Sequence, residues 1–139
     1  MIAISCLGSL IAYKQIRIAS AKLNLDLYDR RFKVFETARN LVSHVMREAH
    51  VGLNNIGDFN LGVADVTFLF GSDVEVYLTA LRKKAIALRT KVEQLRGIEE
   101  PSERRNPLVD QIADLEMALS VEYEQMVEVF RPYLKLDNI

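Results

Sequence analysis

The sequence predicts an all-α fold: a long N-terminal helix, a short helix, and an antiparallel pair of long helices that together form a bundle. Three observations favour helices over strands. Apolar residues recur at spacings of three and four through most of the chain. Only six glycines and three prolines are present, and most of them lie between the periodic stretches. The long stretch Lys22–Met46 contains neither residue.

Length and composition are those of one globular domain. The chain has 139 residues, of which 50% are hydrophobic and 27% charged, enough to bury a core. Its net charge of −1 provides no general attraction to nucleic acid, so a nucleic-acid partner is not favoured. The single cysteine, Cys6, excludes an intrachain disulfide and a multi-cysteine zinc site.

The N-terminal segment suggests membrane attachment. Residues 1–13 carry no charged side chain, and the cations Lys14, Arg17 and Lys22 follow them directly. A helix that spans a bilayer needs about 20 apolar residues, so this segment is short even if Ile16 and Ile18 extend it. No basic region precedes the apolar run, which argues against a signal peptide.

Two interpretations of this segment stay open. In the first, residues 1–19 form a short or truncated single-pass anchor, continuous with the first helix, and residues 20–139 form the bundle domain. The cations after the apolar run then predict a bacterial inner-membrane protein whose C-terminal domain is cytoplasmic. In the second, the segment is a buried or partner-covered helix of a soluble bundle.

One continuous helix is expected from Lys14 to about His50. Its buried stripe should consist of Leu23, Leu27, Val34, Ala38, Leu41 and Val45. A second row, formed by Tyr28, Phe35, Val42, Met46 and Ala49, widens the apolar face, so the helix should pack against at least two others. The charged group Asp29-Arg30-Arg31 is interpreted as solvated intrahelical pairing. Arg30 and Arg31 are also candidates for an interaction surface.

The middle of the chain predicts a loop and one short helix. Gly52 and the residues up to Asp58 should form the loop. A helix capped by Asp58 or Asn60 should then run to Phe70 and end at Gly71. A strand over Val66–Phe70 is the alternative, but it would have no partner strand. Phe68 should point away from the helix's apolar face and be partly exposed, for packing or for binding a partner.

Two long helices complete the bundle. Ser72 and Glu75 have the spacing of a capping box, and the helix that follows should end at Gly97. Asn106 and Pro107 predict the N-cap and first residue of the last helix, which Pro132 ends. The residues from Tyr133 to Leu136 should fold back as an apolar tail.

Glu122 is the one polar interruption of the last apolar stripe. We expect it at the edge of the stripe, exposed to solvent. The alternative is a buried contact with a cation of a facing helix, Arg39 or Arg89, that fixes the register.

Opposite charges should match the two long helices to each other. Residues 73–97 contain six cations against three acids, and residues 107–131 contain six acids against one cation. This pattern favours their pairing over wrong ones. Arg82, Lys83 and Lys84 are therefore expected to face the acidic helix in part. The alternatives for these three are an anionic lipid and, less favoured, nucleic acid.

The candidate sites for chemistry are weak. His44 and Glu48 lie four residues apart and could supply half of a metal site. The sequence contains no Glu-x-x-His motif, phosphate-binding loop, nucleophile elbow or dinucleotide-binding turn. We therefore expect no metal, no cofactor and no enzymatic activity.

Three segments together resemble a group of small bacterial proteins of uncharacterised function. They are Leu25–Phe35, Phe68–Leu78 and Phe130–Leu134, and they are spread over most of the chain. The resemblance implies one N-terminal transmembrane helix followed by a cytoplasmic helical domain, and it names no activity. The apolar start of this chain is shorter than is typical of the group.

The sequence thus predicts a non-enzymatic, membrane-anchored helical module that self-associates or docks another protein. The membrane would be contacted through residues 1–19. The alternative is a soluble helical bundle that binds a small ligand, an anionic lipid or nucleic acid through Arg82, Lys83 and Lys84.

Overall fold

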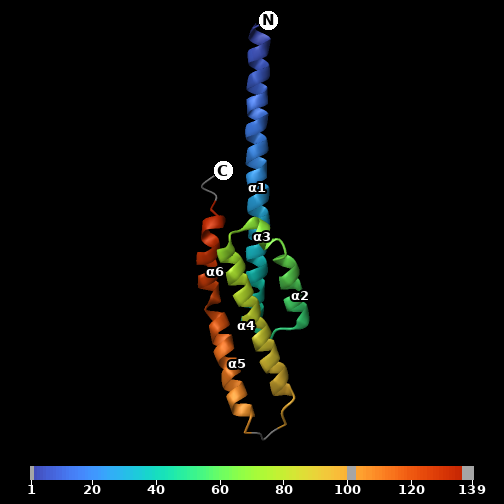
Figure 1. Ribbon diagram of the computed structural model, residues 1–139, viewed down its shortest axis with the longest axis vertical. Coiled ribbons are helices and arrows are strands. Elements are labelled where there is room, and N and C mark those ends of the chain that lie inside the picture. Colours follow the sequence, from blue (N-terminus) through green and yellow to red (C-terminus); the bar gives the residue numbers. More distant parts are fainter. Residues whose placement is uncertain (1, 100–102, 136–139) are drawn as a thin grey trace.

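The computed structural model describes residues 2–99 and 103–135, with side chains from residue 6 onwards. It confirms the all-α prediction: a long N-terminal helix, a bent short helical segment, and long helices packed antiparallel (Figure 1). The elements are α1 (Ile2–Glu48), α2 (Leu53–Gly62), α3 (Val66–Leu69), α4 (Ser72–Arg96), α5 (Arg105–Ser120), α6 (Glu122–Phe130) and the 3-10 helix η1 (Arg131–Tyr133).

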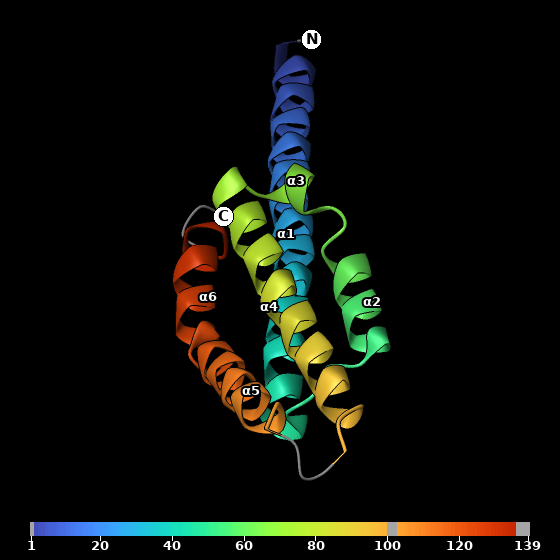
Figure 2. The ribbon, with the colours of Figure 1, turned by 60° about the horizontal axis from the view of Figure 1, so that its bottom comes forward.

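Helix α1 is the spine of the bundle. It contacts α2 and α3 as well as α5 and α6, while α4 packs mainly against α5. Figure 2 shows α4 in front of α1, with α2 on one side and α5 and α6 on the other. This arrangement explains the wide apolar face of α1, because a helix with several neighbours must bury more than one stripe.

Only the C-terminal half of α1 belongs to the core. Its buried residues begin at Val34 and continue through Phe35, Ala38, Leu41, Val42 and Val45. The prediction that Leu23 and Leu27 are buried is wrong, since their exposed fractions are 68% and 36%. The part of α1 that contains them projects beyond the other helices (Figure 1), so the described residues leave both side chains exposed. Met46 and Ala49, also expected in the apolar rows, are exposed at the other end.

The segment after α1 contains two helices rather than a loop and one helix. Leu53, predicted in the loop, begins α2, and the side-chain oxygen of Asn55 accepts a hydrogen bond from the Gly52 N–H at 2.8 Å. This contact satisfies a backbone donor at the start of the helix, and burial of Phe59 holds α2 against its neighbours. As expected, Phe68 on α3 points outward, with 86% of its surface exposed.

The N-terminus of α4 does not use the expected capping box. Ser72 is the first helical residue and Gly71 is the N-cap. The Gly71 N–H donates to the Tyr133 hydroxyl at 3.2 Å, and the Glu75 carboxylate accepts from the Thr67 hydroxyl at 3.2 Å. Tertiary partners thus replace the local ones that the spacing of Ser72 and Glu75 indicated.

The last helix begins earlier than predicted and is broken. Its N-cap is Arg104 rather than Asn106, and Pro107 is accommodated in the first turn, where its missing N–H costs no hydrogen bond. At Val121 the chain makes a turn that separates α5 from α6. The Ser120 hydroxyl donates to the Met117 carbonyl at 2.7 Å, a local bond of the kind that competes with the regular helix.

Aromatic residues close the core near the base of the projecting helix. Phe130 is fully buried, and its ring contacts Phe35 and Phe70 edge-on, with centroids 5.4 and 5.2 Å away. Tyr133 and Leu134 are half-buried against the core, as predicted for the C-terminal tail. Leu136, predicted in the same tail, lies outside the described residues.

Candidate functional site

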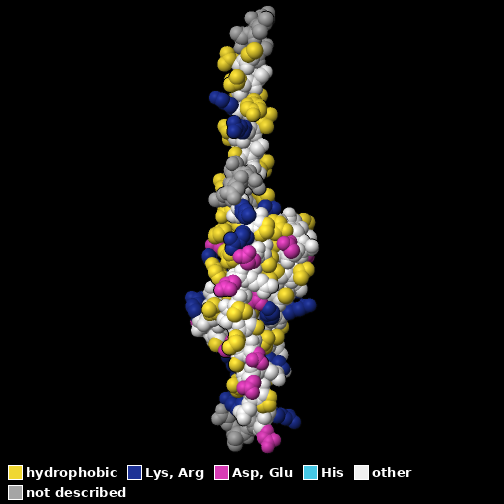
Figure 3. Space-filling view, turned by 90° about the vertical axis from the view of Figure 1, so that its left-hand side faces the viewer, with side chains coloured by type: hydrophobic (Ala, Val, Ile, Leu, Met, Phe, Trp, Pro, Cys, Tyr) yellow, Lys and Arg dark blue, Asp and Glu magenta, His cyan; other side chains and the backbone are white. Residues whose placement is uncertain are grey.

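The most conspicuous surface is the projecting part of α1. All residues from Cys6 to Leu27 are exposed, and we call this segment the arm. Figure 3 shows hydrophobic side chains spread along it, with Lys and Arg side chains between them. Its large exposed apolar residues are Leu7, Leu10, Ile11, Tyr13, Ile16, Ile18, Leu23, Leu25 and Leu27.

These side chains surround the arm instead of forming one stripe. Consecutive helical residues are rotated by about 100°, so Leu10, Ile11 and Ile16 point to three sides roughly a third of a turn apart. Their exposed fractions are 59%, 53% and 66%. A helix that is apolar all round is normally buried, either in lipid or within a larger assembly.

Within the part of the chain that the structure describes, no helix combines the length and apolarity needed to cross a membrane.

Arg31, a predicted surface residue, is instead part of a junction between α1, α3 and η1. Its Nε donates to the Leu69 carbonyl at 2.8 Å, and its Nη1 to the Tyr133 carbonyl at 3.5 Å. The guanidinium carbon also lies 5.8 Å from the centroid of the Phe70 ring and 5.4 Å from that of Tyr133. Arg31 therefore caps the C-terminal end of α3, while its neighbour Arg30 is exposed.

Tyr133 completes this junction from the C-terminal side. Its hydroxyl donates to the Asp73 carboxylate at 2.7 Å and accepts the Gly71 N–H. The hydrogen bond to Asp73 raises the pKa of the Tyr133 hydroxyl above its ordinary value. The base of the arm is thus held by Arg31 of α1, Tyr133 of η1 and the start of α4.

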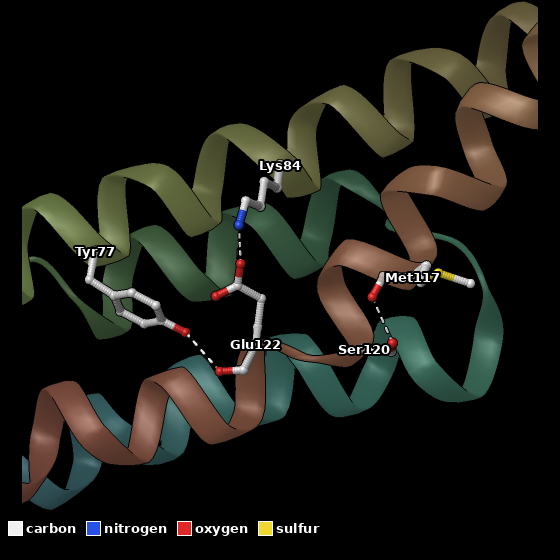
Figure 4. A network of polar contacts seen from close by, with 5 residues as sticks. All are labelled: Tyr77, Lys84, Met117, Ser120 and Glu122. Carbon is white, nitrogen blue, oxygen red and sulfur yellow. Dashed lines mark hydrogen bonds and ion pairs between the residues drawn. The ribbon is translucent and has the colours of Figure 1, made fainter.

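Lys84, the third residue of the predicted basic cluster, forms an ion pair with a residue of α6 (Figure 4). Its Nζ pairs with the carboxylate of Glu122, which is only 2% exposed. The expectation that Glu122 lies exposed at the stripe's edge is therefore wrong. The alternative of a buried contact is right in kind, but the partner is Lys84, while Arg39 pairs with Glu36 on its own helix.

Tyr77 holds the backbone of Glu122 in place. Its hydroxyl donates to the Glu122 carbonyl at 3.2 Å (Figure 4). Burial, and then the nearby Glu122 carboxylate, raise the pKa of the Tyr77 hydroxyl. The predicted charge match between the long helices is realised at this point, where α4 meets the start of α6.

Arg82 and Lys83 are exposed on α4. Arg82 lines an open cleft between α2, α3 and α4 of about 310 Å³, together with Glu75, Thr67 and Thr79. The five predicted surface residues do not gather into one site. Arg30 and Arg31 lie on α1, where Arg31 contacts α3 and η1. Arg82, Lys83 and Lys84 lie in the middle of α4, and only Lys84 of these three pairs with Glu122 in the described contacts.

His44 lines a second cleft, of about 280 Å³, between α1 and α2. The other polar lining residues include Asn40, Arg47, Asn55 and Asp58. Glu48 is not among them. Within the described residues, no group of three or more His, Cys, Asp or Glu side chains has the geometry to hold a metal ion.

Sequence reasoning missed the roles of Tyr77 and Tyr133. Tyr77 lies next to Leu78 in the apolar pattern of α4, so its position indicates burial but not its bond to the Glu122 carbonyl. Tyr133 follows Pro132, and only the folded chain brings it to Gly71 and Asp73.

No protein-family model matches this chain, and comparison with curated proteins and with solved structures finds no match either.

Proposed function

We propose that this protein is a non-enzymatic helical module attached to a membrane by its arm, with the bundle serving self-association or the docking of another protein. The observation that carries the proposal is the arm, which exposes large apolar side chains on all sides to solvent. Exposed apolar surface of this extent is costly in water and is typical of a segment that enters lipid or a partner.

The order of apolar and charged residues along the segment favours insertion into a membrane. Cations follow the apolar start directly, and the first acidic residue of the sequence is Asp26. This order is that of a helix whose N-terminal part enters the bilayer while the following domain stays on the cytoplasmic side. The resemblance to small bacterial proteins with one N-terminal transmembrane helix points to the same placement, at the inner membrane in a single pass.

Attachment does not depend on a full crossing. A helix can also bind with its apolar side chains at the boundary between headgroups and acyl chains. Shallow insertion and single-pass insertion are two forms of the same proposal. Extraction of the membrane fraction at alkaline pH distinguishes the two forms.

A binding role for the basic residues of α4 has less support. Lys84 is occupied by Glu122, and the net charge of the chain is −1. Binding of a small ligand or nucleic acid through Arg82, Lys83 and Lys84 would have to rely mainly on two exposed cations. An absence of catalytic motifs in the sequence supports a non-enzymatic role.

Membrane fractionation of the intact protein in bacterial cells tests the proposal. We expect wild-type protein in the membrane fraction, and the triple variant Leu10→Gln/Ile11→Gln/Ile16→Gln in the soluble fraction. The matched control Leu61→Gln/Phe68→Gln/Val76→Gln replaces three exposed apolar residues of the bundle and should stay in the membrane fraction. Recovery of the wild-type protein in the soluble fraction without detergent contradicts the proposal.

A further inference from the structure

The arm carries three cations and one acid. Lys14, Arg17 and Lys22 are all exposed, and we call them the basic collar. The arm contains a single carboxylate, at Asp26, beyond the collar and next to the point where side chains begin to be covered. The net charge of residues 6–25 is therefore +3 in a chain whose net charge is −1.

The collar is short along the helix axis and lies on one side of it. Lys14 and Lys22 are eight residues apart, which corresponds to about 12 Å of helix. At about 100° per residue, the three side chains lie within a sector of about 140°. Ile16 and Ile18 alternate with them and expose 66% and 68% of their surface. Basic and apolar side chains thus occupy the same two turns, as at the boundary between headgroups and acyl chains.

We propose that the basic collar binds the headgroups of anionic phospholipids, so that the arm prefers membranes that contain them. This inference rests on the proposed membrane attachment and specifies its lipid class. Lys and Arg near a negatively charged leaflet each strengthen binding, and their long stems allow the charge to reach the headgroups while apolar neighbours insert.

A second copy of the arm is a poorer occupant of this surface. Two arms packed side by side would bring like charges together over residues 14–22, with no acid in the segment to pair with them. A bilayer with anionic headgroups supplies opposite charge and an apolar phase together, which matches both components of the arm.

Co-sedimentation of the full chain with lipid vesicles tests the inference. We compare vesicles of phosphatidylcholine alone with vesicles in which part of it is replaced by phosphatidylglycerol. The expected result is stronger binding to the anionic vesicles, reduced by added salt. The variant Lys14→Gln/Arg17→Gln/Lys22→Gln should bind the anionic vesicles roughly 100-fold more weakly, because each of the three cations contributes about a fivefold factor.

The control variant Arg47→Gln/Arg82→Gln/Lys83→Gln changes the net charge by the same amount with exposed cations of the bundle. It should retain the anionic preference. Equal loss in both variants overturns the role of the collar. Equal binding of the wild-type protein to both kinds of vesicle overturns the anionic preference and leaves membrane attachment standing. Binding to neither kind overturns both proposals.

Discussion

The ammonium of Lys84 on α4 pairs with the carboxylate of Glu122 at the start of α6, and that carboxylate is almost fully buried. The pair joins two helices directly after the turn at Val121, and Tyr77 binds the adjacent carbonyl. A buried carboxylate is tolerated only with such a partner, so this contact fixes the register between α4 and α6.

Removing one partner of this pair should cost more than removing both. We expect Lys84→Met to lower the free energy of unfolding by about 2 kcal/mol, because an unpaired carboxylate stays buried; partial exposure of Lys84 moderates the loss. The double variant Lys84→Met/Glu122→Leu should recover most of that loss. Urea unfolding measures both values, and a double variant less stable than Lys84→Met would contradict the explanation.

Two glycines of α2 should respond oppositely to alanine. A Cβ at Gly57 would meet nothing within 4 Å, so Gly57→Ala should stabilise the protein by about 0.5–1 kcal/mol through helix propensity. A Cβ at Gly62 would lie 2.4 Å from the Thr37 hydroxyl oxygen on α1. Gly62→Ala should therefore push α2 away from α1 and destabilise by about 1–2 kcal/mol. The offsetting gain in helix propensity is smaller than at Gly57, because Gly62 is the last residue of α2.

Thermal unfolding of both alanine variants tests this contrast. The double variant Gly62→Ala/Thr37→Gly removes the clash and serves as the control, compared with Thr37→Gly alone. If Gly62→Ala remains destabilising in that background, the close approach to Thr37 is not the cause.

Tyr77 should make the fold sensitive to alkaline pH. Its pKa is raised in the folded state by burial, so above about pH 10 the unfolded chain loses the Tyr77 proton while the folded chain keeps it. The free energy of unfolding should then fall as pH rises, by up to about 1.4 kcal/mol per pH unit from this group. Below that pH, Tyr77 contributes no pH dependence.

Tyr77→Phe should therefore be less stable at neutral pH by about 1 kcal/mol, the usual value of a lost hydrogen bond. It should also show a shallower decline above about pH 10 than the wild-type protein. Denaturant titrations at a series of pH values measure both effects. Tyr123→Phe, at an exposed position of α6, is the matched control and should retain the wild-type decline.

Arg30 and Arg31 are neighbours in sequence with different expected roles in stability. Arg31→Ala removes the hydrogen bond to the Leu69 carbonyl and the contacts with two aromatic rings, so we expect a loss of about 1–2 kcal/mol. Arg30→Ala changes an exposed side chain and should shift stability by less than about 0.5 kcal/mol. Similar losses for both variants would show that Arg31 does not fix the junction.

The α-helical class, the long first helix and the antiparallel pairing could be read from the sequence, because periodicity and the scarcity of glycine and proline are properties of the chain itself. The direction in which Phe68 points followed from the same periodicity. Helix ends were less predictable. Ser72 and Glu75 have the spacing of a cap, yet Tyr133 and Thr67, both from elsewhere in the chain, take the hydrogen bonds.

The tertiary structure alone decided which apolar residues are covered. Leu23 and Leu41 belong to the same apolar row, but the other helices reach only the second of them. The tertiary structure also decided which cationic side chains have partners and which are exposed. The sequence places Arg30, Arg31, Lys83 and Lys84 in the same candidate interaction surface. In the folded protein Arg31 and Lys84 are half-buried and bind partners on other helices, whereas Arg30 and Lys83 are exposed. Periodicity is a local property of the chain, while burial and pairing depend on which distant segments meet, and this is the physical reason for the difference.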